Sequence, residues 1–252
     1  MKLKGKVALV TGGAGGVGSA TCRLLASEGA YVAINFNSSE KAALLLEQEI
    51  VNAGGVAKAF KADITDLACV KQLISEVVLT YGALDILVNN AGWTQVVPSE
   101  DLAGLTDELI QKTFLLKVNA PIYLAQNARE YLSKSNNANI INITSVAGIA
   151  ARGSSLAYAA ANAALSNLTR SLARTLAPQI RVNAVAPGFM ETGFAYPADG
   201  VMAGNVSKNN FIGRCVTEDD VAAAVLFLCT DGRSITGEEI VVDGGIGRLG
   251  KK

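Results

Sequence analysis

The sequence predicts an α/β fold: one doubly wound parallel sheet of about seven strands, with helices on both of its faces. Three observations support this prediction. Short apolar runs alternate with longer amphipathic runs, which is typical of βαβ crossovers. The short runs are apolar throughout, as expected for strands covered on both faces. No linker, repeat or low-complexity segment interrupts the alternation, so we expect residues 1–252 to form a single domain.

Each element is placed by this alternation, since every predicted strand but the last leads into a predicted helix. In chain order the strands are Val7–Val10, Tyr31–Asn35, Val56–Lys61, Ile86–Asn89, Asn139–Thr144, Arg181–Val185 and Glu239–Val242. The helices that connect them are Gly16–Glu28, Glu40–Asn52, Leu67–Tyr81, Leu105–Ser133, Leu156–Leu176 and Glu218–Cys229. Helical crossovers between parallel strands are right-handed, which fixes how the sheet is wound.

One stretch breaks the alternation. Gly193 to Arg214 is long, shows no clear period and mixes aromatic and other apolar residues with polar ones. Long connections of this kind in compact domains usually cover a binding site. We expect a substrate loop at about residues 193–214; a merely tolerated insertion is the alternative.

The composition excludes several classes of function. The 22 Lys+Arg balance the 22 Asp+Glu, and nucleic acids and anionic membranes both favour a basic surface, so neither is an expected partner. With 50% hydrophobic and 17% charged residues, the chain is not disordered. The longest apolar stretch, Val221–Cys229, is half a membrane span at most. No targeting segment is visible, and we expect a soluble, cytoplasmic protein.

The chain contains no histidine. This excludes Ser-His and Cys-His nucleophilic systems and every zinc site that needs a histidine. The four cysteines, Cys22, Cys69, Cys215 and Cys229, lie far apart without CxxC spacing, so we expect buried free thiols and no metal site. Proton transfer must therefore use Tyr, Lys, Asp, Glu or Cys.

A glycine-rich segment follows the first predicted strand. It fits GxGxxG at Gly13, Gly15 and Gly18, and TGxxxGxG at Thr11, Gly12, Gly16 and Gly18. Glycines at a strand-to-helix junction allow a tight turn and a close approach of the backbone to a diphosphate. The N-terminus of the following helix supplies N–H donors and a favourable dipole. The segment predicts a dinucleotide site.

The end of the second predicted strand bears on the choice of dinucleotide. An acidic residue there would bind the ribose 2′-hydroxyl of NAD and repel the 2′-phosphate of NADP. Here Asn37 and Ser38 follow the strand, and no carboxylate occurs before Glu40. NADP(H) is therefore favoured over NAD(H), although no Arg or Lys stands among these residues to pair with the phosphate. Asp63, with Ile64 after the third strand, is a candidate adenine contact.

Taken together, the motifs resemble those of the short-chain dehydrogenase/reductase family, over essentially the whole chain. They are Thr11–Gly18, Asn89-Asn90-Ala91-Gly92, Asn119, Ser145, Tyr158, Pro187-Gly188, Thr192 and the closing Val242-Asp243-Gly244-Gly245. The resemblance implies a Rossmann-like fold, NAD(H) or NADP(H) as cofactor, and hydride exchange between a carbonyl and an alcohol.

The resemblance also implies a role for each matching residue. Asn89–Gly92 would support the central sheet and border the adenine ribose, and Pro187, Gly188 and Thr192 would meet the nicotinamide. Ser145 would hydrogen-bond the substrate oxygen, Tyr158 would be the general acid or base, and Asn119 would hold a water-linked proton path. In a chain without histidine, a tyrosine near a serine hydroxyl is also the natural proton donor to a developing alkoxide.

The sequence departs from the family pattern at one position. The family has YxxxK, and this chain has Tyr158-Ala-Ala-Ala-Asn162. Residues i and i+4 share a helix face, so Asn162 lies where a lysine would bind the nicotinamide ribose and lower the pKa of the tyrosine. Asn162 can hydrogen-bond the ribose but carries no charge. We expect turnover to be impaired by roughly 10²–10⁴-fold relative to a lysine-bearing form, with oxidation affected more than reduction.

Three explanations for Asn162 stay open. It is a substitution introduced to silence the enzyme, a natural variant assisted by another cation such as Lys117 or Arg152, or the mark of an inactive relative. The leading function is an NAD(P)(H)-dependent oxidoreductase acting on a small carbonyl or alcohol. The alternative is a nucleotide-binding sensor or scaffold without turnover. By the resemblance, a homotetramer or homodimer is the expected assembly.

Overall fold

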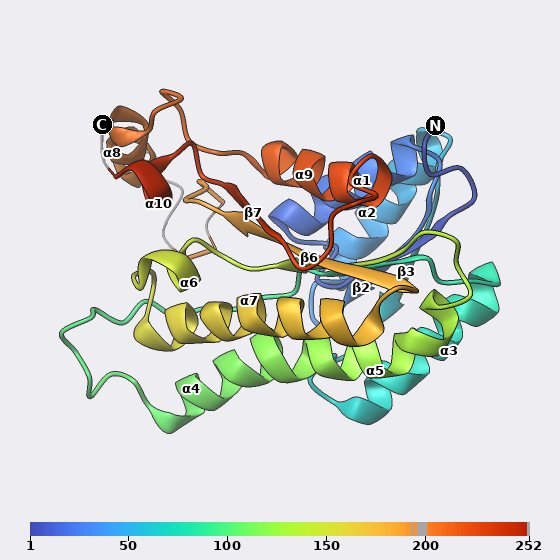
Figure 1. Ribbon diagram of the computed structural model, residues 1–252, viewed down its shortest axis with the longest axis horizontal. Coiled ribbons are helices and arrows are strands. Elements are labelled where there is room, and N and C mark those ends of the chain that lie inside the picture. The colour runs from blue at the N-terminus through green and yellow to red at the C-terminus, as the bar shows by residue number, and fades with distance from the viewer. Residues whose placement is uncertain (193, 196–200, 251–252) are drawn as a thin grey trace.

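The computed structural model describes residues 1–192, 194–195 and 201–250, and these residues form a seven-stranded parallel sheet between two layers of helices (Figure 1). The strand order is β3-β2-β1-β4-β5-β6-β7. The strands are β1 (Val7–Val10), β2 (Tyr31–Phe36), β3 (Val56–Lys61), β4 (Ile86–Asn89), β5 (Ala138–Ile143), β6 (Ile180–Pro187) and β7 (Glu239–Val242). The predicted fold class is confirmed.

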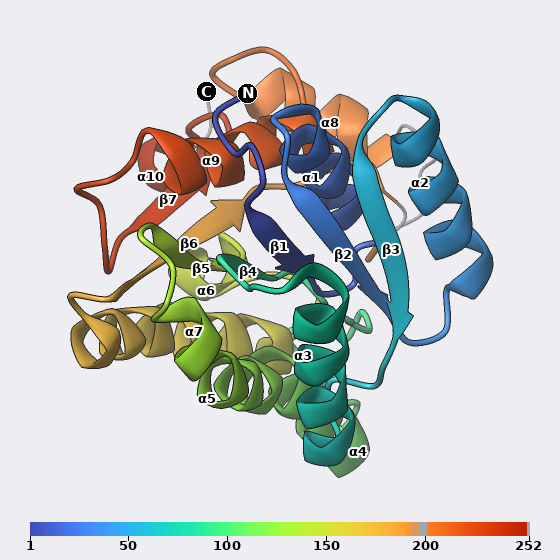
Figure 2. The ribbon, with the colours of Figure 1, turned by 90° about the vertical axis from the view of Figure 1, so that its right-hand side faces the viewer.

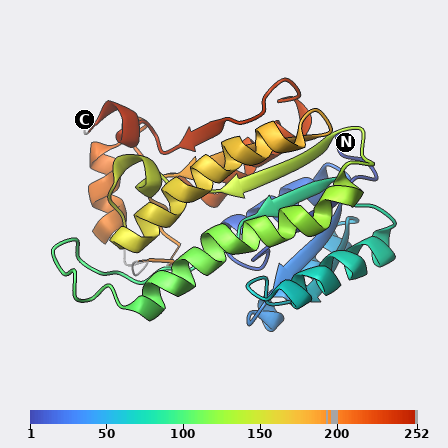
Figure 3. The same ribbon diagram turned by 60° about the horizontal axis from the view of Figure 1, so that its bottom comes forward.

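The helices divide between the two faces of the sheet, as Figure 2 shows. On one face lie α1 (Gly16–Ser27), α2 (Glu40–Asn52) and α9 (Glu218–Thr230). On the other lie α3 (Leu67–Tyr81), α5 (Ala120–Leu132) and α7 (Leu156–Leu176). In Figure 3, α7 runs beside the continuous rod formed by α4 (Asp107–Phe114), the π-helical turn η1 (Leu115–Asn119) and α5. Each face of the sheet therefore has its own hydrophobic core.

Burial along the strands follows their position in the sheet. All residues of the central strands β1 and β4 are buried, which explains why these strands are apolar except for Asn89 at the end of β4. The outermost strand β3 instead alternates buried and exposed residues, and it places Lys58 and Lys61 in solvent. The expectation of strands that are apolar throughout is thus wrong for β3, because an edge strand lies outside the zone where both helical layers cover the sheet.

The long segment predicted as one helix over Leu105–Ser133 contains a change of pitch. It begins with α4, capped by the Thr106 hydroxyl, which accepts from Leu109 N at 3.3 Å. Five residues of π-helix, η1, then join α4 to α5. A π turn has more residues than an α turn, so it rotates the side chains of the two flanking helices relative to each other. This rotation decides which residues of η1 face the interior.

Three short helices add to the predicted set. They are α6 (Ala147–Ala150), α8 (Val201–Asn209) and α10 (Ile246–Leu249). The helix α8 falls within the predicted loop 193–214, of which positions 193 and 196–200 lie outside the described residues. Within the part of the chain that the structure describes, no helix combines the length and the apolar character needed to cross a bilayer.

Candidate active site

A cavity of about 1380 Å³ lies along the carboxyl-terminal ends of the strands. The strand order reverses there, because the chain passes from β1 to β2 on one side and returns through β4 on the other. Such a switch point is where ligands bind in open α/β sheets. Its walls come from the turn after β1 and from the segments that follow β2 to β6, with further side chains from α4, η1 and α7.

Two backbone segments interlock at the floor of the cavity. The Asn90 side chain donates to the carbonyls of Thr11 and Gly12, both at 3.0 Å. In return the Thr11 hydroxyl accepts from the N–H groups of Asn90 at 3.0 Å and Ala91 at 3.1 Å. A Cβ on Gly18 would lie 2.3 Å from the Gly12 carbonyl oxygen and 2.7 Å from Asn90 Nδ2. Glycine is therefore required at position 18 by packing.

The same close approach explains Gly12. Its φ is +58°, and a Cβ there would lie 2.9 Å from the Ala91 Cα. Gly15 and Gly16 line the cavity at the N-terminus of α1, whose first turn carries no acidic residue. The N–H groups of a helix's first turn lack intrahelical partners and attract anions. This end of the cavity is suited to a diphosphate.

The ends of β2 and β3 form the next part of the wall. Asn37 and Ser38 are exposed and line the cavity, as do Asp63 and Ile64. One carboxylate oxygen of Asp63 accepts from the Thr65 N–H at 2.9 Å and from the Thr65 hydroxyl at 2.6 Å. These bonds hold the turn after β3 in place beside the loop after β2.

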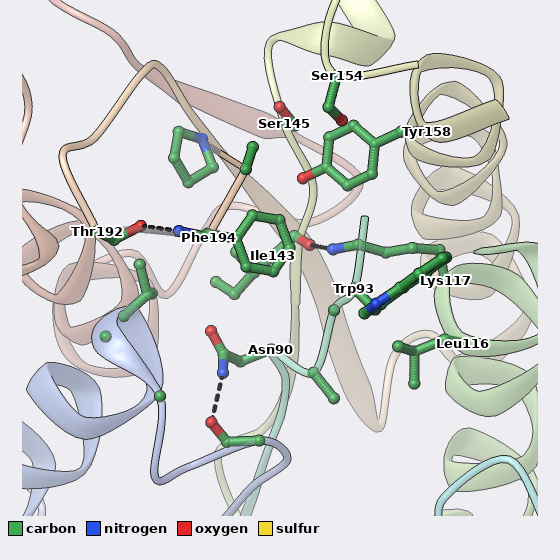
Figure 4. Close-up of a pocket in the computed structure, with 18 of the residues that line it drawn as sticks. Asn90, Trp93, Leu116, Lys117, Ile143, Ser145, Ser154, Tyr158, Thr192 and Phe194 are labelled. Carbon is green, nitrogen blue, oxygen red and sulfur yellow. Dashed lines mark hydrogen bonds between the residues drawn. The ribbon is translucent and has the colours of Figure 1, made fainter. Parts of the chain in front are cut away.

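Ser145 and Tyr158 enter the cavity from β5 and α7. Ser145 lies two residues beyond β5, and its hydroxyl accepts from Ala147 N at 3.1 Å. The Ser155 hydroxyl caps α7 by accepting from Tyr158 N at 3.1 Å, which places the tyrosine in the first turn. In Figure 4 the phenol oxygen of Tyr158 points toward Ser145. Burial raises the pKa of the phenol, while hydrogen bonds with Ser145 and Asn162 oppose that rise.

Asn162 is brought next to Tyr158 in the helix but does not line the cavity. Its side chain is fully buried, and Nδ2 donates to the Tyr158 carbonyl at 2.8 Å. Its Oδ1 has no hydrogen-bond partner among the described residues. On the opposite side, α6 packs so tightly that a Cβ on Gly148 would lie 2.8 Å from the Asn162 carbonyl carbon. The short amide therefore ends inside the protein, below the cavity surface.

The structure also separates Asn119 from the site. Asn119 is exposed at the end of η1 and is not among the cavity residues, whereas Lys117, two positions earlier, is. Lys117 is 4% exposed, and its Nζ donates to the Ile143 carbonyl at 2.9 Å. The same atom lies 6.0 Å from the centre of the Tyr158 ring. Burial lowers the pKa of Lys117 to about 8.

The segment after β6 closes the far side of the cavity. Pro187, Gly188 and Thr192 all line it. Gly188 N donates to the Val242 carbonyl at 2.8 Å, and a Cβ on Gly188 would lie 2.7 Å from the Asp243 Cβ. The Val-Asp-Gly-Gly segment thus supports this wall from behind.

Sequence reasoning missed several apolar side chains of the cavity. Besides Trp93 and Phe194, the latter within the predicted substrate loop, the lining includes Leu115, Leu116, Phe189 and Met190. Lys112 lies over the Trp93 ring, with Nζ 3.9 Å from its centre, and the Phe194 and Tyr158 ring centres are 6.2 Å apart. Phe189 and Met190 directly follow Pro187-Gly188, so their place beside that motif was the available signal.

Of the residues predicted for the site, most meet in this one cavity. They are Gly12, Gly16, Asn37, Ser38, Asp63, Ile64, Asn90, Ala91, Gly92, Ser145, Tyr158, Pro187, Gly188 and Thr192. Outside its lining lie Gly18, which packs behind the turn, Asn119 and Asn162, as well as the motif residues Thr11, Gly13 and Asn89. The parallel sheet and the glycine-rich turn at its switch point place the chain among the Rossmann-like α/β proteins.

Comparison with known proteins identifies the family. Residues 12–247 match the family model described as enoyl-(acyl carrier protein) reductase. The chain is 35% identical to the 7α-hydroxysteroid dehydrogenase of Bacteroides fragilis over 252 residues, which covers 97% of this chain and 95% of the relative. It is 35% identical to the 3-oxoacyl-acyl-carrier-protein reductase of Thermotoga maritima over 248 residues, covering 98% of this chain and 99% of the relative.

A solved structure agrees with these sequence matches. A short-chain dehydrogenase from Burkholderia cenocepacia in complex with NADP superposes with a TM-score of 0.89 at 38% identity, covering 97% of this chain and 98% of that chain. The chain belongs to the short-chain dehydrogenase/reductase family of oxidoreductases.

Proposed function

We propose that the chain is an NAD(P)(H)-dependent oxidoreductase that exchanges a hydride between a carbonyl and an alcohol, with NADP(H) favoured over NAD(H). The observation that carries this proposal is one cavity that holds both the glycine-rich turn and the Ser145–Tyr158 pair. A nucleotide-binding protein without turnover would need the first feature but not the second.

The residues present fit a dinucleotide. The glycine-rich turn brings its backbone to the cavity surface, because Gly12, Gly15 and Gly16 have no Cβ and Ala14, which also lines the cavity, has only a small side chain. The turn is rigid, since Asn90 ties it to the segment after β4. Asn90, Ala91 and Gly92 would border the ribose, and Pro187, Gly188 and Thr192 would meet the nicotinamide. When bound, the nicotinamide supplies or accepts the hydride.

The preference for NADP(H) rests on charge. Asn37, Ser38 and Ser39 line the cavity where β2 ends, and none of them carries a carboxylate. The next residue, Glu40, is exposed and lies 4.0 Å from Lys61 Nζ, which offsets its charge. A similar protein has been solved with NADP. A 2′-phosphate would therefore meet hydroxyl and amide donors there.

Tyr158 would hold the proton that the reaction moves. Burial raises the pKa of Tyr158 above that of a free phenol, about 10, so the group is protonated at neutral pH. A protonated phenol can donate to the oxygen of a carbonyl that is being reduced, and Ser145 would orient that oxygen by a hydrogen bond. The reverse direction needs a tyrosinate and is favoured only as pH rises.

The side chains that line the cavity favour a carbonyl compound whose remaining part is apolar. Trp93, Leu116, Phe189 and Met190 all line the cavity. The two curated relatives are named for a hydroxysteroid and a 3-oxoacyl thioester, both of which have such an apolar part. Association into a homotetramer or homodimer, a cytoplasmic location and a single domain over residues 1–252 remain predictions.

Cofactor consumption over a panel of cyclic ketones, 3-oxoacyl thioesters and the matching alcohols tests this function. We expect turnover with NADPH above that with NADH, and a loss of roughly 10²–10⁴-fold in Tyr158→Phe with cofactor binding retained. Binding is followed by the fluorescence of the reduced cofactor. Binding without consumption on every substrate would favour the sensor or scaffold instead.

A further inference from the structure

A buried amine lies beside the proposed proton carrier. Lys117 reaches the cavity from η1, and its Nζ is 6.0 Å from the centre of the Tyr158 ring. In Figure 4 this amine lies below the ring and next to the Ile143 carbonyl, which accepts from it at 2.9 Å. A lysine buried to 4% exposure is costly to place, because its charge loses hydration. We therefore ask what a buried cation at this position contributes to the site.

The surrounding backbone makes room for this amine. The π-helical turn η1 directs Lys117 inward and leaves Asn119 exposed. A Cβ on Gly92 would lie 3.3 Å from both Cε and Nζ of Lys117, so glycine at position 92 leaves the lysine its space. Two separate segments therefore accommodate one side chain, and π turns often occur at functional sites.

The other candidates for a cation at Tyr158 fit less well. Arg152 lines the same cavity but is exposed, so water screens its charge. Position 162, where the family pattern has lysine, holds a buried amide bonded to its own helix. The remaining charged groups among the described lining residues are Asp63, Glu108 and Lys112, and none of them is buried.

We propose that Lys117 is a positioning cation for Tyr158, supplying from η1 the charge that YxxxK supplies from position 162. This inference rests on the proposed function. In alcohol oxidation the O–H proton passes to the Tyr158 oxygen and the hydride passes from carbon to the nicotinamide, which leaves a carbonyl. The ammonium of Lys117 stabilises the tyrosinate that accepts this proton. In reduction the same proton returns to the alkoxide oxygen and solvent replaces it.

The charge on Lys117 is present at neutral pH. Burial lowers the pKa of Lys117 to about 8, so the amine is mostly protonated at pH 7. A tyrosinate formed beside it favours the ammonium in turn, so the two groups titrate together and Tyr158 loses its proton more readily than it would beside a neutral side chain. A lysine introduced at position 162 should therefore raise the rate of alcohol oxidation only slightly while Lys117 is in place.

The test compares Lys117→Met, neutral and of similar length, with Lys134→Met, a matched loss of an exposed lysine just beyond the end of α5. For Lys117→Met we expect alcohol oxidation at pH 7 to fall about tenfold or more, and its alkaline inflection to move up by about one pH unit or more. Adding Asn162→Lys to Lys117→Met should restore much of the loss. Lys134→Met should match the parent chain.

A second measurement does not depend on turnover. Tyrosinate absorbance is titrated in the parent chain and in Lys117→Met, each with Tyr158→Phe subtracted, and the Tyr158 transition should move to higher pH in Lys117→Met. If no substrate is turned over, the proposed function fails while this titration still tests Lys117. If Lys117→Met does not fold, the Lys117→Asn, Asn162→Lys exchange carries the test, and we expect it to be active.

Two results would overturn the inference. One is an unchanged Tyr158 transition and pH profile in a folded Lys117→Met. The other is a gain of about 10²-fold or more from Asn162→Lys alone, the scale expected if the site lacked a cation.

Discussion

The two halves of the cavity are built in different ways. The half next to β1 and β2 is held together largely by backbone groups. The turn after β1 and the segment after β4 are joined by four hydrogen bonds, each with a backbone group as donor or acceptor. In the half next to β5 and β6, side chains from separate elements meet, namely Ser145, Tyr158 and Lys117, and the proposed reaction depends on them. In the first half, packing leaves glycine as the residue that fits at its key positions. In the second half, the proposed cation can come from a different element than in the family pattern.

This difference predicts separate consequences for substitutions. A change in the backbone half should affect folding and cofactor binding together, because the same atoms serve both. A change in the side-chain half should affect the reaction while the fold and the cofactor affinity are kept. Two substitutions test this contrast, and a third tests how an exposed side chain in the half next to β1 and β2 sets the cofactor preference.

The largest effect is expected for Gly18→Ala. The added methyl would lie 2.3 Å from the Gly12 carbonyl oxygen, and this backbone atom cannot move without breaking the turn. We expect a loss of about 3 kcal/mol of unfolding free energy, together with weaker cofactor binding. Thermal and urea unfolding measure the first, and cofactor fluorescence the second. Gly204→Ala is the control, since a Cβ there meets nothing within 4 Å; equal losses in both variants would contradict the packing argument.

A smaller effect, confined to rate, is expected for Ser145→Ala. Loss of the hydroxyl that orients the substrate oxygen should lower kcat by about 10²-fold, or ~2.7 kcal/mol, with cofactor affinity nearly unchanged. Steady-state kinetics and fluorescence titration separate the two. Ser171→Ala, an exposed position on α7, should behave as the parent chain. If Ser145→Ala weakened cofactor binding as much as it slowed turnover, the two halves would not be separable.

The smallest effect is expected for Ser38→Asp. A carboxylate at this exposed position of the lining would repel a 2′-phosphate and accept from a ribose hydroxyl. The ratio of kcat/KM for NADPH to that for NADH should fall about tenfold, which is ~1.4 kcal/mol. Ser38→Asn has the same shape without the charge and should leave the ratio close to that of the parent chain. A fall of the same size in Ser38→Asn would assign the effect to shape rather than charge.

The contrast between the halves also explains what the sequence could predict. All seven strands occur at the predicted places, and β6 extends two residues further, to Pro187. The glycine motif could be interpreted because steric contact leaves few residue types possible at Gly12 and Gly18. Periodicity missed α8, since its nine residues include Gly204 and form too short a run for a period to emerge.

The half that holds Ser145 and Tyr158 was harder to predict for a physical reason. The family resemblance implied that Asn119 would hold a water-linked proton path, and Lys117 was only one of two candidate cations. Helix-face arguments assume 3.6 residues per turn, and η1 departs from that value at these positions. The sequence of η1, Leu-Leu-Lys-Val-Asn, contains no glycine or proline, and the available signal was Pro121 just after it, which lacks the N–H that an α-helix would direct to the carbonyl of residue 117.

The π turn has a consequence for how this protein can change in length. Each residue of an α-helix advances the chain by about 100° around the axis, so removing one residue from η1 would turn α4 against α5 by that angle. Lys117 would then leave its place below Tyr158 even though no side chain of the site had been altered. Insertions and deletions between α4 and α5 should therefore change the surroundings of Tyr158 as much as substitutions do. The number of residues between Phe114 and Ala120 is thus itself a determinant of the site.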